Sequence, residues 1–145
     1  MSEILPKPDL KFFTSWLISS ISMFSASYVW HGIILNDFLR ISYPKDIFLI
    51  VAALVYLGIG LLITVLTYAL KKLKESFKYG VFIGGAMGIF IYAIAFILGI
   101  SFYTTVDFKM IAFDGSWQII EQGFGGLICA VTYRAMMKRE KALLV

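Results

Sequence analysis

IFLIVAALVYLGIGLLITVLTYAL, residues 47–70, is the segment that most constrains the structure of this chain. Its 24 residues include no charged side chain, and a helix needs only about 20 apolar residues to cross a bilayer. Three further apolar runs cover about residues 12–35, 79–103 and 113–137. Because these runs are continuous rather than alternating, they predict helices and exclude a β-barrel. We therefore expect an all-α fold, a four-transmembrane-helix bundle in which residues 1–145 form a single integral membrane domain.

The composition also indicates insertion into lipid. Hydrophobic residues make up 60% of the chain and charged residues 15%, compared with roughly 45–50% and 25% in soluble domains. The first residues lack the basic start and short apolar core of a cleavable signal peptide, so we expect the first apolar run to remain in the mature protein. We therefore predict a multi-pass protein of the cell membrane whose surface contacts the lipid bilayer.

Lysine and arginine residues are distributed unevenly between the predicted loops. Ten belong to the two chain ends and the second loop: Lys7, Lys11, Lys71, Lys72, Lys74, Lys78, Arg134, Lys138, Arg139 and Lys141. Only Arg40, Lys45 and Lys109 belong to the other two loops. Because cytoplasmic loops carry the excess of Lys and Arg, this pattern places the N- and C-termini in the cytoplasm. The topology and contact with anionic lipid account for the net charge of +4, and we expect no nucleic-acid partner.

Glycine residues repeat at helical spacing in the third and fourth runs. Gly80, Gly84 and Gly88 form a doubled G-x-x-x-G pattern, and the fourth run contains Gly123 and Gly126. Small residues let membrane helices approach closely, and van der Waals contact then holds the helices together. We therefore predict helix packing at these five glycines. The glycine groove of the third run could face another helix of the same chain or a second copy of the chain.

Two ionisable residues lie inside the apolar runs, His31 in the first and Glu121 in the fourth. Such a side chain at bilayer depth costs roughly 2.5–3.5 kcal/mol on insertion scales, so it needs a partner, a cavity or a function. Both residues are expected in the outer half of the membrane. Four other polar side chains fall at depths that would allow contact with them: Gln118, Gln122, Tyr56 and Tyr92. We predict that these six residues form a ligand or proton site.

Three hypotheses account for this polar group. The first is a hydrogen-bonded network that fixes helix register, with Glu121 protonated or paired with His31. The second is a proton-linked or cation-binding site of a small transporter, in which Glu121 exchanges a proton and His31 relays it. The third is a cofactor site, such as haem with His31 as axial ligand, although one histidine cannot supply two axial ligands. We expect no cofactor and no metal.

Motifs of known catalytic sites are missing from the sequence. It contains no Ser-His-Asp order, H-E-x-x-H motif or phosphate-binding loop, so hydrolytic and nucleotide-driven mechanisms have no support and no catalytic residue is predicted. The single cysteine, Cys129, excludes an intramolecular disulfide and is interpreted as a buried, inert thiol. Asp37 and Asp114, at or outside the outer boundary, are interpreted as solvated loop or cap residues.

Two short segments resemble a known family. W-H-G-I-I-L-N-D-F, residues 30–38, resembles the W-L-G-x-x-x-x-D-F stretch at the end of helix one in a family of small bacterial four-helix membrane proteins of unknown function. D-G-S-W, residues 114–117, resembles that family's D-x-x-W at the start of helix four. His31 and Ser27 depart from the pattern, because the family usually has leucine and aspartate at these positions. The resemblance implies a four-helix membrane architecture and no particular activity.

We therefore predict a small polytopic membrane protein that acts as a proton-linked transport or small-ligand-binding module. A homo-oligomer is expected for that function, because four helices enclose too small a cross-section for a wide pore and a path would lie between protomers. The alternative is a non-catalytic accessory or scaffold subunit of a larger membrane complex, whose polar residues only specify packing.

Overall fold

The computed structural model of the chain describes residues 8–39, 41–42, 44–70, 76–100 and 107–143. These residues form four long helices, α1 (Leu10–Ser27), α2 (Lys45–Ala69), α3 (Lys78–Ile100) and α4 (Phe108–Leu143). A π-helical segment, η1 (Tyr28–Ile34), continues α1, and a short 3₁₀ segment, η2 (Asp37–Leu39), follows it. No strand is present in the described residues. The predicted all-α fold with four helices is therefore confirmed.

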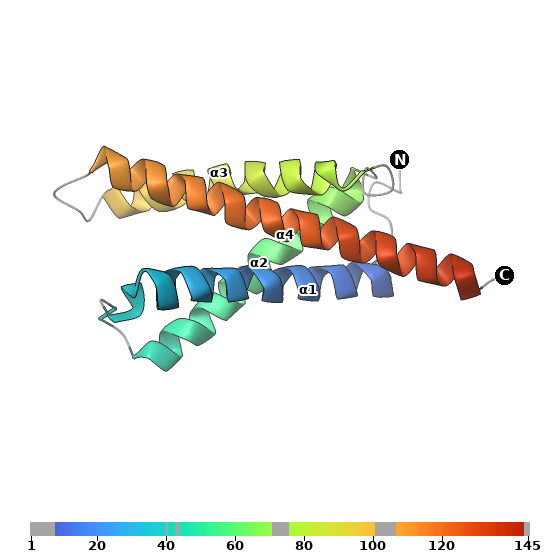
Figure 1. Cartoon of the computed structure of the whole chain (residues 1–145), viewed down its shortest axis with the longest axis horizontal. Helices are drawn as coiled ribbons and strands as arrows, with labels where there is room; N and C mark the ends of the chain where they lie inside the picture. Colours follow the sequence, from blue (N-terminus) through green and yellow to red (C-terminus); the bar gives the residue numbers. More distant parts are fainter. Residues whose placement is uncertain (1–7, 40, 43, 71–75, 101–106, 144–145) are drawn as a thin grey trace.

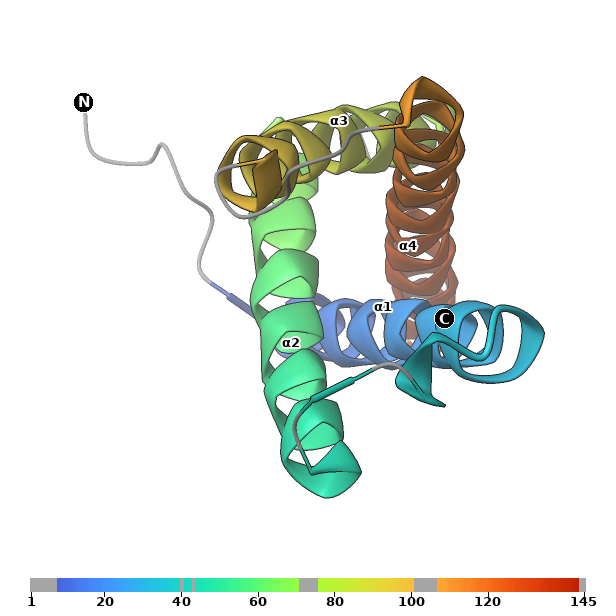
Figure 2. The ribbon, with the colours of Figure 1, turned by 90° about the vertical axis from the view of Figure 1, so that its left-hand side faces the viewer.

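Helices α3 and α4 form an antiparallel pair, and α1 and α2 complete the bundle. Figure 1 shows α3 alongside α4, while α1 lies below them and α2 crosses behind at an oblique angle. Seen from the end in Figure 2, the four helices form the sides of a frame in the order α3, α4, α1 and α2. The start of α1 and the end of α4 lie at one end of the bundle. The end of α1 and the start of α4 lie at the other (Figure 1).

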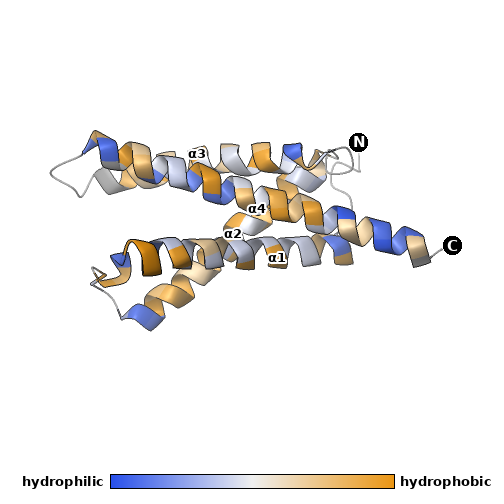
Figure 3. Ribbon diagram, viewed as in Figure 1, coloured by the Kyte–Doolittle hydropathy of each residue, from blue (hydrophilic) through white to orange (hydrophobic). Residues whose placement is uncertain are grey.

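Three helical segments are long and apolar enough to cross a membrane: Leu10–Ile34, Lys45–Ala69 and Lys78–Leu98. Helix α4 contains the predicted fourth run, but within the described residues it does not reach this apolarity, because its sequence includes groups such as Glu121 and Gln122. Hydropathy colouring in Figure 3 places hydrophilic segments at both ends of the bundle and mostly apolar helix between them.

The helix boundaries differ from the predicted runs in two respects. Helix α4 extends beyond residues 113–137 in both directions, because residues 108–112 and the charged residues 138–143 continue the helix. The run over residues 12–35 changes from α- to π-helical winding at Tyr28, and the Leu35 amide donates to the Trp30 carbonyl group at 2.9 Å. Residues 101–103 of the third run lie outside the described residues, as do Lys7, Arg40, Lys71, Lys72 and Lys74 of the charge pattern.

Close backbone contact holds α3 against α4 of the same chain. A side-chain carbon added at Gly80 would overlap the carbonyl oxygen of Gly126, and one added at Gly84 would overlap the carbonyl oxygen of Gln122. At Gly88 the same carbon would lie only 2.6 Å from a carbonyl oxygen of α4. Of the two predicted glycines on α4, Gly126 also faces α3 closely, because a side-chain carbon there would overlap the carbonyl oxygen of Gly80. Gly123 has more room, since a side-chain carbon there would lie at ordinary contact distance from α3. The glycine groove of α3 is therefore occupied within the monomer.

Helix α1 packs on its neighbours through serine and methionine side chains. Ser19 Oγ donates to the carbonyl oxygen of Gly125 at 2.7 Å, and the Met23 side chain fills the space beside Gly125. On α2, Gly60 leaves room for the Ser20 side chain in the same way. Glycines on α2 and α4 thus let α1 approach both helices, which brings the polar residues of α4 into the interior.

Replacing Gly84 with alanine should force α3 and α4 apart, because the added methyl group would overlap the backbone of α4. Overpacking of this kind destabilises by about 1–3 kcal/mol. Gly58→Ala on α2 is the matched control, since nothing lies within 4 Å of the added methyl group. It should stabilise the protein by about 0.5–1 kcal/mol. Unfolding in mixed micelles measures both effects, and equal stabilities for the two variants would contradict the contact.

Candidate functional site

A buried carboxylate, Glu121 of α4, is the centre of the candidate site. Its side chain is 1% exposed, and three hydrogen-bond donors converge on it. The Tyr56 hydroxyl donates to Oε1 at 2.5 Å, the Trp117 indole Nε1 to Oε2 at 2.9 Å, and the Gln122 amide Nε2 to Oε1 at 3.2 Å. We call Tyr56, Trp117, Glu121 and Gln122 the carboxylate cluster.

Three helical segments position the carboxylate cluster. Trp117 precedes Glu121 by four residues, so both side chains lie on the same face of α4. Tyr56 reaches Glu121 from the middle of α2. Trp30 of η1 stacks on Trp117, with ring centroids 4.0 Å apart and planes 7° apart, and so fixes the indole that donates to Glu121. The cluster therefore joins α2, α4 and the extension of α1.

His31 forms a separate pair with Asp37. Its Nδ1 atom lies 2.8 Å from Asp37 Oδ2, and both side chains are about one-third exposed. An ionised carboxylate only accepts hydrogen bonds, so His31 Nδ1 is the donor. Asn36, with φ of 54°, turns the chain between the two residues, a conformation that asparagine tolerates better than most residues. Asp37, interpreted as a solvated loop or cap residue, is partly exposed at the start of η2 and in addition bonds His31.

A cavity of about 150 Å³ lies between the His31–Asp37 pair and the carboxylate cluster. His31, Tyr56 and Ser27 all line it. Its remaining walls are mainly aromatic, from Phe24, Tyr28, Phe38 and Phe48. Tyr56 therefore faces the cavity while its hydroxyl group donates to Glu121.

The structure brings together only part of the predicted group. Tyr56, Glu121 and Gln122 are in contact. Tyr92 lies apart, because its hydroxyl donates to the Ile111 carbonyl oxygen at 2.8 Å and its ring borders Gly115. Gln118 lies one helical turn before Gln122 and is half-buried, with its carbonyl oxygen facing Gly88 of α3.

Sequence reasoning missed Trp117 as a member of the site. Its position near the outer end of the fourth run indicates an interfacial anchor, whereas in the structure its indole nitrogen donates to Glu121. The four-residue spacing between Trp117 and Glu121 is the signal that would have identified it.

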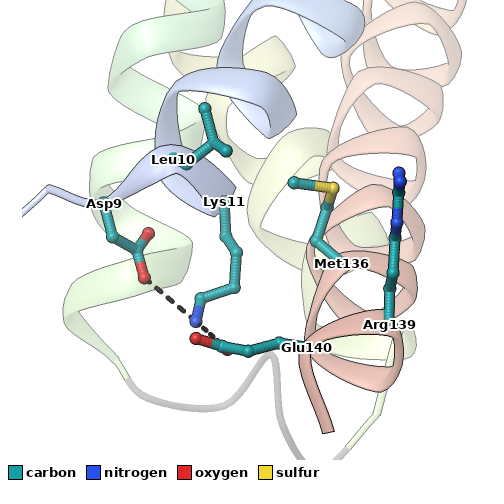
Figure 4. A pocket seen from close by; sticks show the side chains of 6 residues that line it. All are labelled: Asp9, Leu10, Lys11, Met136, Arg139 and Glu140. Carbon is teal, nitrogen blue, oxygen red and sulfur yellow. Dashed lines mark hydrogen bonds and ion pairs between the residues drawn. The ribbon is translucent and has the colours of Figure 1, made fainter. Parts of the chain in front are cut away.

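The opposite end of the bundle contains an ion-pair group rather than a second polar core. Lys11 Nζ lies 3.3 Å from Asp9 Oδ2 and 2.5 Å from Glu140 Oε2, so it joins the start of α1 to the end of α4. Figure 4 shows the Lys11 ammonium group between the carboxylates of Asp9 and Glu140. Together with Leu10, Met136 and Arg139, these side chains line a cavity of about 480 Å³. Both carboxylates are substantially exposed, so we expect these ion pairs to contribute little to the free energy of unfolding.

The thiol of Cys129 is buried between the hydroxyl groups of Thr64 and Thr67, at 3.5 and 3.7 Å. Among the described residues, no group of three or more His, Cys, Asp or Glu side chains is placed to hold a metal ion.

Comparison with models of known protein families, with curated proteins and with solved structures finds no match. The resemblance to a family of four-helix membrane proteins therefore stays a prediction.

The bond between Tyr56 and Glu121 can be tested with a double-mutant cycle. Tyr56→Phe and Glu121→Gln should be non-additive by about 0.5–3 kcal/mol, because residues in one hydrogen-bond network couple. Tyr92→Phe combined with Glu121→Gln is the matched control and should be additive within about 0.5 kcal/mol, since Tyr92 bonds elsewhere. Unfolding free energies of the single and double variants give both couplings. Additivity in both pairs would contradict the contact.

Proposed function

We propose that this chain is a multi-pass membrane protein in which all four helices cross the bilayer and both termini are cytoplasmic. Three apolar helices support this topology, as does the excess of Lys and Arg around the chain ends and the second loop. The polar residues Glu121 and Gln122 of α4 are buried against other helices, which lowers the cost of placing them in the bilayer. The His31–Asp37 pair then lies at the outer end of the bundle.

We further propose that the protein is a proton-linked transport or small-ligand-binding module with Glu121 as the proton-binding group. The observation that supports this most directly is the Tyr56 hydroxyl group, which donates to buried Glu121 and belongs to a residue that lines a cavity reaching His31. A hydroxyl group can donate one hydrogen bond and accept another. Tyr56 can therefore pass a proton between Glu121 and a molecule in the cavity.

Two opposing effects suit Glu121 to proton exchange. Three hydrogen-bond donors stabilise the ionised carboxylate, whereas its burial among apolar helices favours the neutral acid. The cavity has room for water, because one water molecule needs only about 10–15 Å³ of such volume, and Ser27, His31 and Tyr56 offer polar partners. Water in the cavity would connect Tyr56 to His31 and then to the outer surface.

A homo-oligomer is the expected working form. Many apolar side chains on all four helices are exposed in the monomer, among them Phe82, Phe90 and Leu54. Lipid or a second copy would cover them. The described cavity approaches Glu121 from the outer end, so a path to the other side of the membrane would lie along an interface between protomers.

The second candidate is a non-catalytic accessory or scaffold subunit of a larger membrane complex. The carboxylate cluster favours it in one respect, because its hydrogen bonds and the Trp30–Trp117 stack join three helical segments and so fix their register.

Native mass spectrometry of the protein extracted gently from its own membranes separates the two cases. A homo-oligomer supports the transport function, and a stoichiometric complex with larger proteins supports the accessory function.

Proton flux in proteoliposomes tests the leading proposal. A pH-sensitive dye inside the vesicles should report acidification when a potassium diffusion potential, negative inside, is applied to the wild-type protein. Glu121→Gln should lower the rate to that of protein-free vesicles, because the amide cannot carry the proton. Glu140→Gln makes the same chemical change at the opposite end of the bundle and should leave the rate unchanged. Wild-type flux equal to that of empty vesicles, or retained flux in Glu121→Gln, would overturn the proposal.

A further inference from the structure

We propose that the cavity between His31 and Tyr56 binds a small organic cation, a methylated ammonium group of about the size of tetramethylammonium. This inference rests on the proposed function, since it names the ligand class of the same site.

The aromatic walls provide the first reason. Five of the residues that line the cavity are aromatic: Phe24, Tyr28, Phe38, Phe48 and Tyr56. Neighbouring rings meet edge to face, with centroids 6.0 Å apart for Phe24 and Tyr56, and 5.6 Å for Phe38 and Phe48. In such a pair, the ring that contributes its edge keeps both faces free for another group. Aromatic faces attract quaternary ammonium groups through their π electrons.

Two carboxyl groups behind the walls provide the second reason. Tyr56 lines the cavity and donates to Glu121, and His31 lines the cavity and lies within hydrogen-bond distance of Asp37. Each carboxylate is therefore one hydrogen bond away from a side chain in the wall. A cation in the cavity would favour the ionised form of both carboxyl groups, and a neutral molecule of the same shape would not.

The aromatic ring of Phe38 already makes a cation–π contact within the protein, with Lys45. The Lys45 ammonium nitrogen lies 5.6 Å from its centroid, within the usual range of a cation–π contact. Gly32 makes room for this ring, because a side-chain carbon there would approach the Phe38 ring to 2.9 Å or less. Lys45 is exposed and does not line the cavity, so the contact shows only that this ring accepts a cation.

The cavity volume limits the ligand. About 150 Å³ accommodates a molecule of benzene size, roughly six non-hydrogen atoms. Tetramethylammonium has five, whereas a larger organic cation would need the cavity to widen. The site therefore favours compact methylated amines over long or polycyclic cations.

Calorimetric titration of the purified full-length protein in detergent with tetramethylammonium chloride tests the inference. We expect saturable binding, and no binding of tert-butanol, the uncharged molecule of the same shape. Phe24→Leu should weaken binding about 2- to 30-fold by removing one aromatic face.

Filling the cavity gives a second and independent test. Ala52 lines the cavity, and Ala52→Leu should abolish tetramethylammonium binding. Its neighbour Ala53 does not line the cavity, so Ala53→Leu on the same helix should bind as the wild type does. Equal binding of tetramethylammonium and tert-butanol, equal effects of the two leucine substitutions, or no binding to the wild type would each overturn the inference.

The two proposals can fail separately. If the wild type conducts protons through Glu121 but does not bind tetramethylammonium, only the ligand assignment fails. If tetramethylammonium binds and Ala52→Leu prevents it while no proton flux is found, proton-linked transport fails and the protein remains a cation-binding module.

Discussion

The hydrogen bonds to the buried carboxyl group of Glu121 constrain the rest of the structure. A carboxylate removed from water is costly unless donors surround it, and here the donors come from α2 and from α4 itself. The Trp30–Trp117 stack adds the extension of α1 to the same cluster. The hydrogen bonds to this one side chain therefore link α2 to α4, and the ring stack links η1 to α4. The same arrangement leaves Tyr56 between the carboxylate and the cavity.

Glycine contacts make this burial possible. Helices α3 and α4 approach until the backbone at Gly84 faces the carbonyl oxygen of Gln122, the residue next to Glu121. Gly125 lets α1 approach the other side of α4, where Ser19 donates to its carbonyl oxygen. With α3 on one side and α1 on the other, Gln122 and Glu121 have almost no exposed surface. Bulkier residues at Gly84 or Gly125 would separate these helices and let the polar side chains reach the surface.

Much of the architecture could be predicted from the sequence. Continuous apolar runs predict helices because their length and composition suffice, and the glycine spacing of α3 predicts a close contact because it places small residues on one face. The partner of that contact, the π-helical winding after Ser27 and the pairing of His31 with Asp37 could not be predicted. These features depend on where other segments lie in space and on the local turn at Asn36. The hydropathy of the sequence indicates neither the position of other segments nor the turn. Likewise, Tyr56 and Tyr92 have similar sequence contexts, and only packing separates them.

Infrared difference spectroscopy of the reconstituted protein during a pH titration tests the central claim, that Glu121 exchanges a proton inside the bundle. The wild type should show a carbonyl-stretch band of a protonated carboxyl group that gains and loses intensity with pH. The band should be missing in Glu121→Gln, and in Tyr56→Phe it should move to a different frequency, because the hydroxyl group that donates to this carboxyl is lost. A spectrum in which no such band responds to pH, or one in which the band persists in Glu121→Gln, would contradict the account.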